Sequence, residues 1–557
     1  MSRRAVVLLV FVAGVLGAIA WLAPSAAEHL TSSASPVRGA LHVHTRRSDG
    51  SGSIAEVAAA AAKAGLEFVV LTDHGDGTRT PDVPSYQRGV LIIDAVEISA
   101  NDGHVVALGL SKTPYPLGGD ARDIVDDVAR LGGMSIAAHP GSAKPELRWT
   151  EWASPFDGLE WLNADSESRD ERWQGWARAL LTYPLRPSES LGAMLDRPDA
   201  VLRRWDALTP RRRVVAVAAS DAHARLDVSS DGSVAGPALV RLPSYESMFR
   251  AFSITVTGVR LSGNAEADGA AVLAAIRDGH VYSTIDALAT PADVSFRASR
   301  AGTTWVGGDF VPPGGGDIEL EVSGNIPAVS RIVLLKGDTT ASSVTGQSLR
   351  TKVPSTEAVY RVEIQRPGAP GSPPVPWVLS NPIYVRARDE IALPRGAAAR
   401  TTLRYDNGPA TGWRTEMSPR SQAALDVVRT TSGTELLLRW AIGGTRTESP
   451  YAAFAMPAGP ALTGNDRLMF TSRADRAMRL SVQFRTENGE RWIRSVYLDD
   501  QPRQLAVFID DLRPAGVTSQ RRLALSSVRD VLFVVDTVNT KPGASGQFWL
   551  DDVKYGR

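Results

Sequence analysis

The histidines of this chain are concentrated in one region and at one kind of position. Six of the eight lie between His42 and His223, each beside an apolar run, in the segments LHVHT, LTDHG, DGHVV, AAHPG and ASDAH. Neutral imidazole is the commonest protein ligand for transition metals, and imidazoles that gather with carboxylates at strand ends build metal pockets. The pattern therefore predicts a site for more than one metal ion, built where several strands end.

The first of these segments predicts a strand that carries two ligands. Residues 40–45 alternate apolar and polar side chains with the period of a strand, so His42 and His44 are expected on one face, where they can share an ion. Asp49 follows in a turn and offers a carboxylate. Ser53 and Glu56 have the spacing of a capping box, which predicts a helix that continues through residue 64.

The same order of strand, polar loop and helix recurs along the chain. Apolar strands are expected at residues 68–71, 90–96, 105–110, 134–138 and 214–219, and a helix is expected at 120–131. Each strand ends at, or begins after, a possible ligand. Strands that alternate with helices and carry polar residues at their carboxyl ends are typical of a (β/α) barrel with its active site at that end.

Single histidines are weak indicators of a metal site. A lone buried histidine is more often a hydrogen-bonded core residue than a ligand, and His29 and His280 are such background cases. Six imidazoles that all fall next to carboxylates at strand ends are a far stronger indication, because the structural interpretation leaves their order along the chain unexplained.

The ordered set of motifs resembles the PHP (polymerase and histidinol phosphatase) superfamily. The matching motifs are HVHTRRSDG, TDHG, Glu97, DGHV, HPG and SDAH, and the resemblance covers roughly residues 38–290. It implies a distorted (β/α)7 barrel with up to three Zn, Mn or Fe ions. By the resemblance, a first metal is held by His42, His44, Glu97 and Asp221, a second by Glu97, His104 and His139, and a third by Asp49, His74 and His223.

The resemblance also implies the chemistry. A water between two divalent cations loses a proton near neutral pH, which supplies a hydroxide nucleophile, while the metals polarise the substrate oxygen. Glu97, Asp221 and His223 would then act through the bound metal. The chain has no cysteine, which excludes thiol catalysis, and no serine lies in a GxSxG motif.

The substrate is less constrained than the metal site. Phosphate substrates need cationic contacts, and the candidates near the expected ligand loops are Arg46, Arg47 and Lys144, with Arg79 and Arg88 as further possibilities. Each of these is also compatible with an ordinary solvated charge.

Two local features have alternative interpretations. Asp73 either orients the imidazole of its neighbour His74 or caps the backbone of its turn. Five tryptophans between residues 149 and 176 either pack in the core or cover the mouth of the barrel, where they would contact an organic group: Trp149, Trp152, Trp161, Trp173 and Trp176.

The N-terminus predicts an export or anchoring signal. Arg3 and Arg4 precede the uncharged, mainly apolar residues 5–23, which are numerous enough to cross a bilayer as a helix. We interpret residues 1–27 as a membrane anchor, with a cleaved signal peptide as the alternative, and residues 28–37 as a tether. The remainder is expected to be extracytoplasmic, anchored to the membrane or secreted.

After the expected barrel at residues 38–287, short strands separated by Gly, Pro and polar turns predict two all-β sandwich domains. The first, at 288–392, is expected to be immunoglobulin-like. A barrel followed by a sandwich that closes with the segment WVLSNPIY is similar to the CehA/McbA-type metallohydrolases, whose named members cleave carbamate or amide bonds. The second, at 401–557, resembles jelly-roll modules of the galactose-binding or carbohydrate-binding type.

Composition and motifs together predict a metal-dependent hydrolase. The 61 basic and 61 acidic side chains balance, which gives no general attraction to nucleic acid. The expected reaction is hydrolysis of a phosphoester, or of a carbamate, ester or amide, in a small-molecule or envelope-derived substrate. The alternative is an envelope protein that binds glycans through its C-terminal module and whose barrel is catalytically idle.

Overall fold

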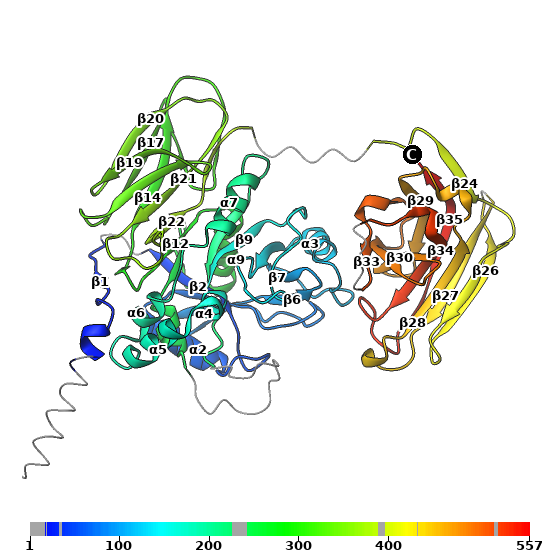
Figure 1. The fold of residues 1–557 in the computed structure, drawn as a ribbon, viewed down its shortest axis with the longest axis horizontal. Helices are drawn as coiled ribbons and strands as arrows, with labels where there is room; N and C mark the ends of the chain where they lie inside the picture. Colours follow the sequence, from blue (N-terminus) through cyan, green and yellow to red (C-terminus); the bar gives the residue numbers. More distant parts are fainter. Residues whose placement is uncertain are drawn as a thin grey trace, which may run out of the picture. The chain divides into compact units, whose positions relative to one another are not determined.

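The computed structural model describes residues 17, 19–32, 36–225, 242–387, 396–431, 433–516 and 522–557 of the chain. These form two compact units (Figure 1). Unit 1 comprises Met1–Ser111 and Asp120–Ile391, and unit 2 comprises Lys112–Gly119 and Ala392–Arg557. A segment of eight residues within the first half of the sequence therefore packs with the C-terminal strands.

The first sheet of unit 1 has five strands in the order β10-β9-β8-β7-β6. Their bounds are β6 (Val96–Ala100), β7 (Gly103–Leu108), β8 (Met134–Ala138), β9 (Gly158–Asn163) and β10 (Val215–Ala219). β8, β9 and β10 are parallel, whereas β7 runs antiparallel to both β6 and β8. β7, β8, β9 and β10 are buried along their whole length, which explains their continuous apolar sequences.

The second sheet continues from the site region into the following sandwich. Its path is β16-β23-β21-β22-β12-β11-β2-β3-β5-β4. The strands nearest the site are β2 (Val37–Val43), β3 (Phe68–Leu71), β4 (Ser85–Gln87), β5 (Val90–Asp94), β11 (Ser253–Val256) and β12 (Val281–Thr284). β2, β3 and β5 are parallel, and β11 is antiparallel to β2 and β12.

The prediction of a TIM-like (β/α)7 barrel is wrong. Residues 38–287 contribute strands to two separate sheets, and the chain is 39% strand and only 17% helix, too little helix for seven crossovers. The physical reason is that hairpins replace helical connections. Ala100 pairs with Gly103 and Gln87 pairs with Val90, so two-residue turns return the chain antiparallel where the barrel requires a helix and a parallel strand.

The helices of unit 1 are short. They are α2 (Ile54–Ala64), α3 (Ala121–Arg130), α4 (Ala164–Asp170), α5 (Trp173–Thr182), α6 (Pro187–Gly192), α7 (Asp199–Leu208), α8 (Tyr245–Phe249) and α9 (Ala265–Asp278). The predicted capping box is confirmed, because Ser53 accepts from the backbone of Glu56 and the Glu56 carboxylate accepts from the backbone of Ser53. Val57, Ala58 and Ala61 of α2 pack into a core cluster with Val43, Val69 and Leu71.

The strands after residue 288 form a sandwich that shares a sheet with the site region. One layer is the four-stranded sheet β15-β14-β17-β20, with bounds β14 (Val294–Arg300), β15 (Thr303–Val306), β17 (Ile318–Gly324) and β20 (Leu349–Val353). The other contains β16 (Phe310–Val311), β18 (Arg331–Lys336), β19 (Thr339–Thr345), β21 (Ala358–Gln365), β22 (Val378–Ser380) and β23 (Ile383–Val385). Tyr282 of β12 pairs with Ser380 of β22, so the sandwich is built onto the sheet that carries β2. Two further strands, β1 (Glu28–His29) and β13 (Ala289–Thr290), pair with each other, which places His29 away from the other histidine segments.

Unit 2 consists of two six-stranded sheets that enclose one apolar core. One sheet contains β24 (Thr401–Tyr405), β26 (Gln422–Arg429), β27 (Thr434–Ala441), β29 (Arg467–Ala474), β32 (Arg503–Phe508) and β35 (Ser545–Gly556). The other contains β25 (Arg414–Met417), β28 (Tyr451–Pro457), β30 (Met478–Thr486), β31 (Arg491–Leu498), β33 (Arg513–Pro514) and β34 (Val528–Asp536). Asn539 donates to the carbonyl oxygen of Pro116 at 3.0 Å, which secures residues 112–119 in this unit.

The predicted N-terminal membrane helix requires a correction. Among the described residues, none of the helices combines the length and apolar character that crossing a bilayer requires. The prediction of a membrane anchor is therefore not supported. Residues 1–16 and 18, which make up most of the expected segment, lie outside the described residues.

Candidate metal centre

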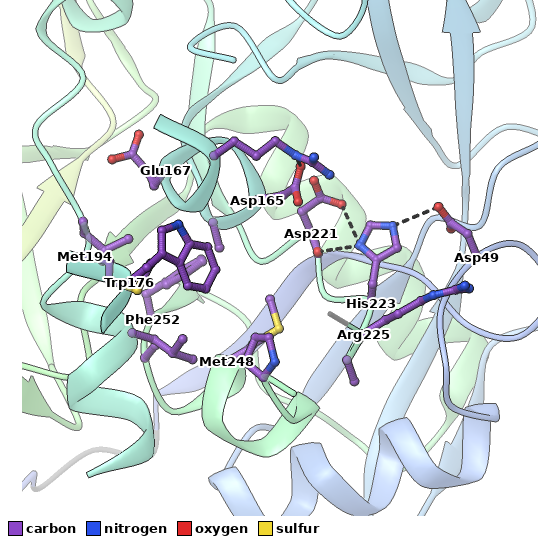
Figure 2. A pocket seen from close by; sticks show the side chains of 17 residues that line it. Asp49, Asp165, Glu167, Trp176, Met194, Asp221, His223, Arg225, Met248 and Phe252 are labelled. Atoms are coloured by element: carbon purple, nitrogen blue, oxygen red, sulfur yellow. Dashed lines mark hydrogen bonds and ion pairs between the residues drawn. The ribbon is translucent and has the colours of Figure 1, made fainter. Parts of the chain in front are cut away.

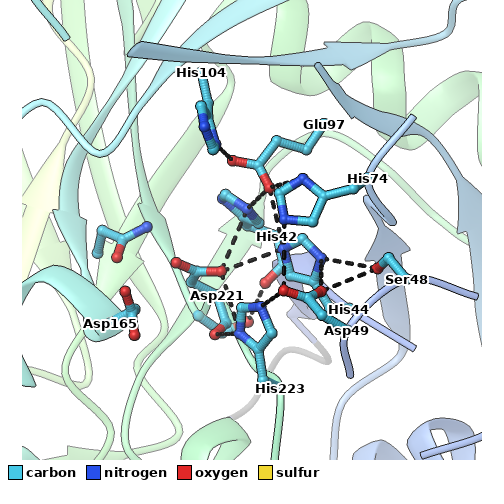
Figure 3. Close-up of polar contacts among 12 residues, drawn as sticks. His42, His44, Ser48, Asp49, His74, Glu97, His104, Asp165, Asp221 and His223 are labelled. Atoms are coloured by element: carbon cyan, nitrogen blue, oxygen red, sulfur yellow. Dashed lines mark hydrogen bonds and ion pairs between the residues drawn. The ribbon is translucent and has the colours of Figure 1, made fainter. Parts of the chain in front are cut away.

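All nine predicted ligands come together in unit 1 (Figure 3). Glu97 is at the centre, since its Oε2 lies 3.2 Å from Nε2 of His42 and 3.3 Å from Nε2 of His44, while its Oε1 lies 2.8 Å from Nδ1 of His104. Nε2 of His139 lies 3.0 Å from the same Oε1. One carboxylate from β6 thus contacts four imidazoles that come from three different segments.

Asp221 and Asp49 complete the arrangement. Oδ1 of Asp221 lies 3.4 Å from Nε2 of His42 and 3.3 Å from Nε2 of His44. Asp49 lies 3.2 Å from Nε2 of His223 and 3.6 Å from Nε2 of His74. The two aspartates share His44 and His223, whereas His42 contacts Asp221 and His74 contacts Asp49.

The backbone at this site is strained in a way that the sequence does not indicate. His42, His139 and Asp221 have φ angles of 67°, 51° and 44°, in the left-handed region that side chains other than glycine rarely adopt. At His42 the pairing of β2 with β3 skips one residue, so His42 is the extra residue of a bulge. His42 and His44 do face the same carboxylates, but through this bulge rather than through simple alternation.

Hydrogen bonds hold the two ligand loops together. Ser220 donates its backbone N–H to Leu41 at 2.9 Å and His44 donates to Ala222 at 3.0 Å, which joins the end of β2 to the loop after β10. An isolated parallel bridge between His74 and Glu97 joins the two sheets at the site itself.

Asp73 stabilises the loop between His44 and Asp49. Its carboxylate accepts from the backbone N–H and the hydroxyl of Thr45, both at 2.7 Å, and from the hydroxyl of Ser48 at 2.8 Å. Asp73 therefore caps the backbone of the loop that follows β2 and not that of its own turn, which differs from both interpretations of the sequence.

Sequence reasoning missed Glu160, a carboxylate buried next to the nine ligands. Its Oε1 contacts Nδ1 of His42, and its Oε2 accepts from the backbone N–H of His139 at 3.0 Å and from Asn163 at 2.8 Å. A carboxylate that holds one nitrogen of a histidine directs the other nitrogen toward a metal. The available signal was a lone acidic residue inside the otherwise apolar strand GLEWLN.

The ligand atoms fall into four overlapping groups that could each hold an ion. Within each group the ligand atoms lie within 4.8 Å of one another. The first group is His44, Asp49, His74 and His223, and the second is His42, His139 and Asp221. The third is His42, His44 and Glu97, and the fourth is His74, Glu97 and His104. Compared with the sets that the resemblance implies, His44 joins the Asp49 group, and His139 groups with Asp221.

Several buried atoms of the cluster lie within ion-pair distance of one another but form no hydrogen bond. Nε2 of His42, Nε2 of His44, Nδ1 of His139 and Oδ1 of Asp221 are inaccessible to solvent and have no hydrogen-bond partner. Unpaired buried polar atoms are costly, and four of them aimed at one place fit divalent cations of the kind that imidazole and carboxylate ligands bind.

The imidazoles and carboxylates of the cluster shift one another's pKa values. Burial by itself raises the pKa of Glu97 and Asp221, but the neighbouring imidazoles, His42 foremost, outweigh it and hold both pKa values well below their usual range. Conversely, burial lowers the pKa of His139, but Asp221 and Glu97 raise it to about 9. The carboxylates thus remain ionised in a buried site, where a bound cation would offset their charge.

A pocket of about 490 Å³ opens beside the cluster (Figure 2). Asp49, Asp221 and His223 lie at its edge, and charged side chains of Asp165, Glu167, Arg169 and Arg225 also line it. Its apolar wall consists of Trp176, Leu191, Met194, Leu195, Pro243, Met248, Ala251 and Phe252. Of the five tryptophans, Trp176 thus lines this pocket, Trp149 and Trp161 are buried in the core, Trp152 packs half-buried against Phe156, and Trp173 is exposed.

The predicted cationic substrate contacts lie elsewhere. Arg46 donates to Glu56 at 2.6 Å, and Arg47 contacts Asp82 and lines a second pocket next to His74, together with Arg79. Arg79 is paired with Asp94 at 2.7 Å, and Arg88 is exposed in the turn between β4 and β5. Lys144 lines neither pocket. His280 contacts Asp309 at 3.0 Å, outside the cluster.

Comparisons with known proteins show only a weak structural similarity, over less than a third of the chain. No family model matches the chain, and no curated protein matches it. Among solved structures, the family 11 carbohydrate-binding module of a cellulosomal cellulase of Clostridium thermocellum is similar at 15% identity and a TM-score of 0.25, covering 29% of this chain and 97% of that one.

Two further solved structures show the same kind of likeness. A family 29 carbohydrate-binding module variant matches at 10% identity and a TM-score of 0.19, covering 28% of this chain and 92% of that one. An exo-beta-agarase matches at 12% identity and a TM-score of 0.20, covering 28% of this chain and 25% of that one. At these values the matches carry no functional argument.

Proposed function

We propose that this protein is a metal-dependent hydrolase that cleaves an ester, carbamate or amide bond in a substrate with an apolar group. One observation carries the proposal: a cluster of six imidazoles and three carboxylates, four of whose buried atoms form no hydrogen bond, lies at the edge of a pocket with an apolar wall. The order of these nine residues along the chain is also what makes the chain resemble the PHP superfamily.

The ligand residues would have distinct tasks. His42, His44, Glu97, His139 and Asp221 would hold the buried ions, and Asp49, His74, His104 and His223 the more accessible ones. Divalent cations bound there would supply a Lewis acid and make water a better nucleophile at neutral pH. Asp221 and His223 lie both in the cluster and at the edge of the pocket, so a substrate in the pocket places its reactive bond beside them.

The residues that line the pocket bear on whether the substrate is a phosphoester or an ester, carbamate or amide. A phosphoester needs cations for its non-bridging oxygens. Arg46, Arg47 and Lys144 do not line this pocket, and of the two arginines that do, Arg169 is paired with Asp165, which leaves Arg225. Trp176, Met248 and Phe252 also line the pocket, and they favour an organic group that is removed from water on binding. These side chains favour an ester, carbamate or amide over a phosphoester.

A substrate panel tests the proposal. Full-length protein supplied with Mn²⁺ or Zn²⁺ is assayed with p-nitrophenyl phosphate, bis-p-nitrophenyl phosphate and naphthyl carbamate, and its metal content is measured. We expect turnover of the carbamate, loss of activity by several orders of magnitude in His42→Ala and Asp221→Ala, and a raised KM in Trp176→Ala. Unchanged turnover in both ligand variants would remove the hydrolase proposal.

Carbohydrate binding by unit 2 is the second candidate function. The observation that favours it is an aromatic side chain among polar ones on the outer face of β35, where Gln547, Trp549 and Asp551 alternate with the buried Phe548 and Leu550. Aromatic rings flanked by hydrogen-bonding groups are suitable platforms for sugars. Binding to mixed-linkage β-glucan and mannohexaose, compared between the wild type and Trp549→Ala, tests it, and binding that does not depend on Trp549 contradicts it.

A further inference from the structure

One arginine of the pocket beside the metal cluster differs from the other arginines near the site. Arg46, Arg47 and Arg79 each contact a carboxylate, and Arg169 pairs with Asp165 on α4. Arg225 also lines the pocket, but no hydrogen bond or ion pair joins it to any of the residues that the structure describes.

The acidic side chains around this pocket are already engaged. Asp49 contacts His223, His44 and His74, at 3.2, 3.3 and 3.6 Å. Glu167 accepts from the backbone N–H of Asp196 at 2.9 Å. Because Asp165 is paired with Arg169, the guanidinium of Arg225 has no carboxylate of its own among the described residues.

Arg225 lies on the metal-cluster side of the pocket, across from its apolar wall. It follows His223 by two residues, and Figure 2 shows its side chain on the same side as His223 and Asp49, opposite Trp176 and Phe252. A ligand whose apolar part contacts Trp176 and Phe252 can therefore extend toward the metal cluster and meet the guanidinium there.

We propose that Arg225 binds an oxyanion group, a carboxylate or a phosphoryl group, carried by the substrate whose apolar part occupies this pocket. Arginine remains charged at any physiological pH and binds planar or tetrahedral oxyanions through paired N–H donors. Next to an apolar wall such a bond is stronger than in open water. The proposal deepens the hydrolase function and depends on it, because it defines the substrate as an apolar molecule that carries a negative charge.

Calorimetry with matched ligands tests the role of Arg225 without turnover. The full chain, loaded with Mn²⁺, is titrated with 4-phenylbutyrate, with 3-phenylpropylphosphonate and with the neutral 4-phenylbutyramide. The proteins are the wild type, Arg225→Met, Arg225→Lys and the control Arg46→Met, which removes an arginine already neutralised by Glu56.

We expect Arg225→Met to weaken binding of an anionic ligand on the order of 10-fold or more, with a change of less than about 2-fold for the amide. Arg225→Lys should retain part of the affinity, and Arg46→Met should leave the ratio of anion to amide affinity unchanged. The ligand that loses more, carboxylate or phosphonate, identifies the group.

The proposal is overturned if Arg225→Met weakens the amide as much as the anions, or leaves the anions unaffected. Turnover of an ester panel by the same proteins is a separate measurement. Absence of turnover with intact discrimination at Arg225 would remove the hydrolase function alone, while turnover with no discrimination would remove only the assignment of Arg225.

Discussion

Glu160 holds Nδ1 of His42 and thereby directs Nε2 of the same ring toward Glu97 and Asp221, at 3.2 and 3.4 Å. Both side chains are buried, and Glu160 also fixes the backbone of His139. The orientation of two proposed ligands therefore depends on one residue that is not itself a ligand.

Replacing Glu160 should weaken metal binding without removing a ligand. For Glu160→Gln we expect a loss of about 10- to 100-fold in metal affinity, because the amide holds the imidazole less firmly and can favour the wrong tautomer. Competition with a chromogenic chelator measures it. The control is Glu266→Gln, an exposed carboxylate on α9, which should bind metal as the wild type does. Equal affinities in Glu160→Gln and the control would contradict the role.

Glu160 was missed because its position in a strand differs from that of most of the predicted ligands. The nine ligands could be found because the apolar runs beside them mark strand ends, and strand ends of neighbouring segments meet, although Glu97 and His104 lie within β6 and β7 themselves. Glu160 lies inside β9, where it resembles an ordinary sheet residue. Its role depends on the bulge at His42, which no spacing rule reveals.

The sheet topology was mispredicted for a related reason. Asn101 and Asp102 separate β6 from β7, and Arg88 and Gly89 separate β4 from β5, so both are two-residue hairpin turns. The two turns involve only a few residues each, and the apolar runs beside them are equally compatible with the parallel strands of a barrel. The assignment of residues 112–119 to unit 2 depends on long-range contacts, such as the one between Asn539 and Pro116, which a sequence pattern cannot show.

Metal binding should stabilise unit 1 selectively. The unpaired atoms of His42, His44, His139 and Asp221 would gain partners only in the folded, metal-bound state. A single ion at 100 times its Kd adds about 2.7 kcal/mol to the free energy of unfolding. Thermal unfolding with and without Mn²⁺, combined with hydrogen exchange by mass spectrometry, should show protection in β2, β6 and β8. Protection that is equal in unit 2 would contradict the proposed location of the ions.

A buried ion pair should anchor α7 to the sandwich of unit 1. Arg361 on β21 forms two bonds with Asp206 on α7, at 2.8 and 2.9 Å, and also contacts Glu363 at 2.7 Å. Arg361→Met leaves Asp206 buried without its partner, so we expect a loss of about 3 to 5 kcal/mol in stability. Arg350→Met, which removes an exposed arginine of the same sandwich, should have little effect. Urea denaturation compares the two, and equal losses would refute the role of burial.

Acid should destabilise unit 2 through a three-strand ion cluster. Arg485 on β30 contacts Glu416 on β25 at 2.7 Å and Asp530 on β34 at 2.6 Å. Its bond lowers the pKa of Glu416; for Asp530, burial raises the pKa, but Arg485, Arg529 and Arg414 outweigh it and lower the pKa overall. Both carboxyls have a lower pKa in the folded state than in the unfolded chain, where it is roughly 4. Their full contribution to the stability of the folded state is therefore present above about pH 4 and is lost as the pH falls further.

Arg485→Met should therefore reduce stability near pH 7 and make it less sensitive to acid. Pulse-labelling hydrogen exchange of the full chain in urea, at several pH values between pH 3 and pH 7, gives the unfolding midpoint of peptides from β30 and β34. We expect the wild-type and variant midpoints to converge at low pH, because protonated carboxyls no longer gain from the guanidinium. Arg439→Met, which removes an exposed partner of Asp426 in the same unit, should run parallel to the wild type at every pH. A gap between wild type and Arg485→Met that stays constant down to pH 3 would show that Arg485 stabilises unit 2 by packing rather than by charge.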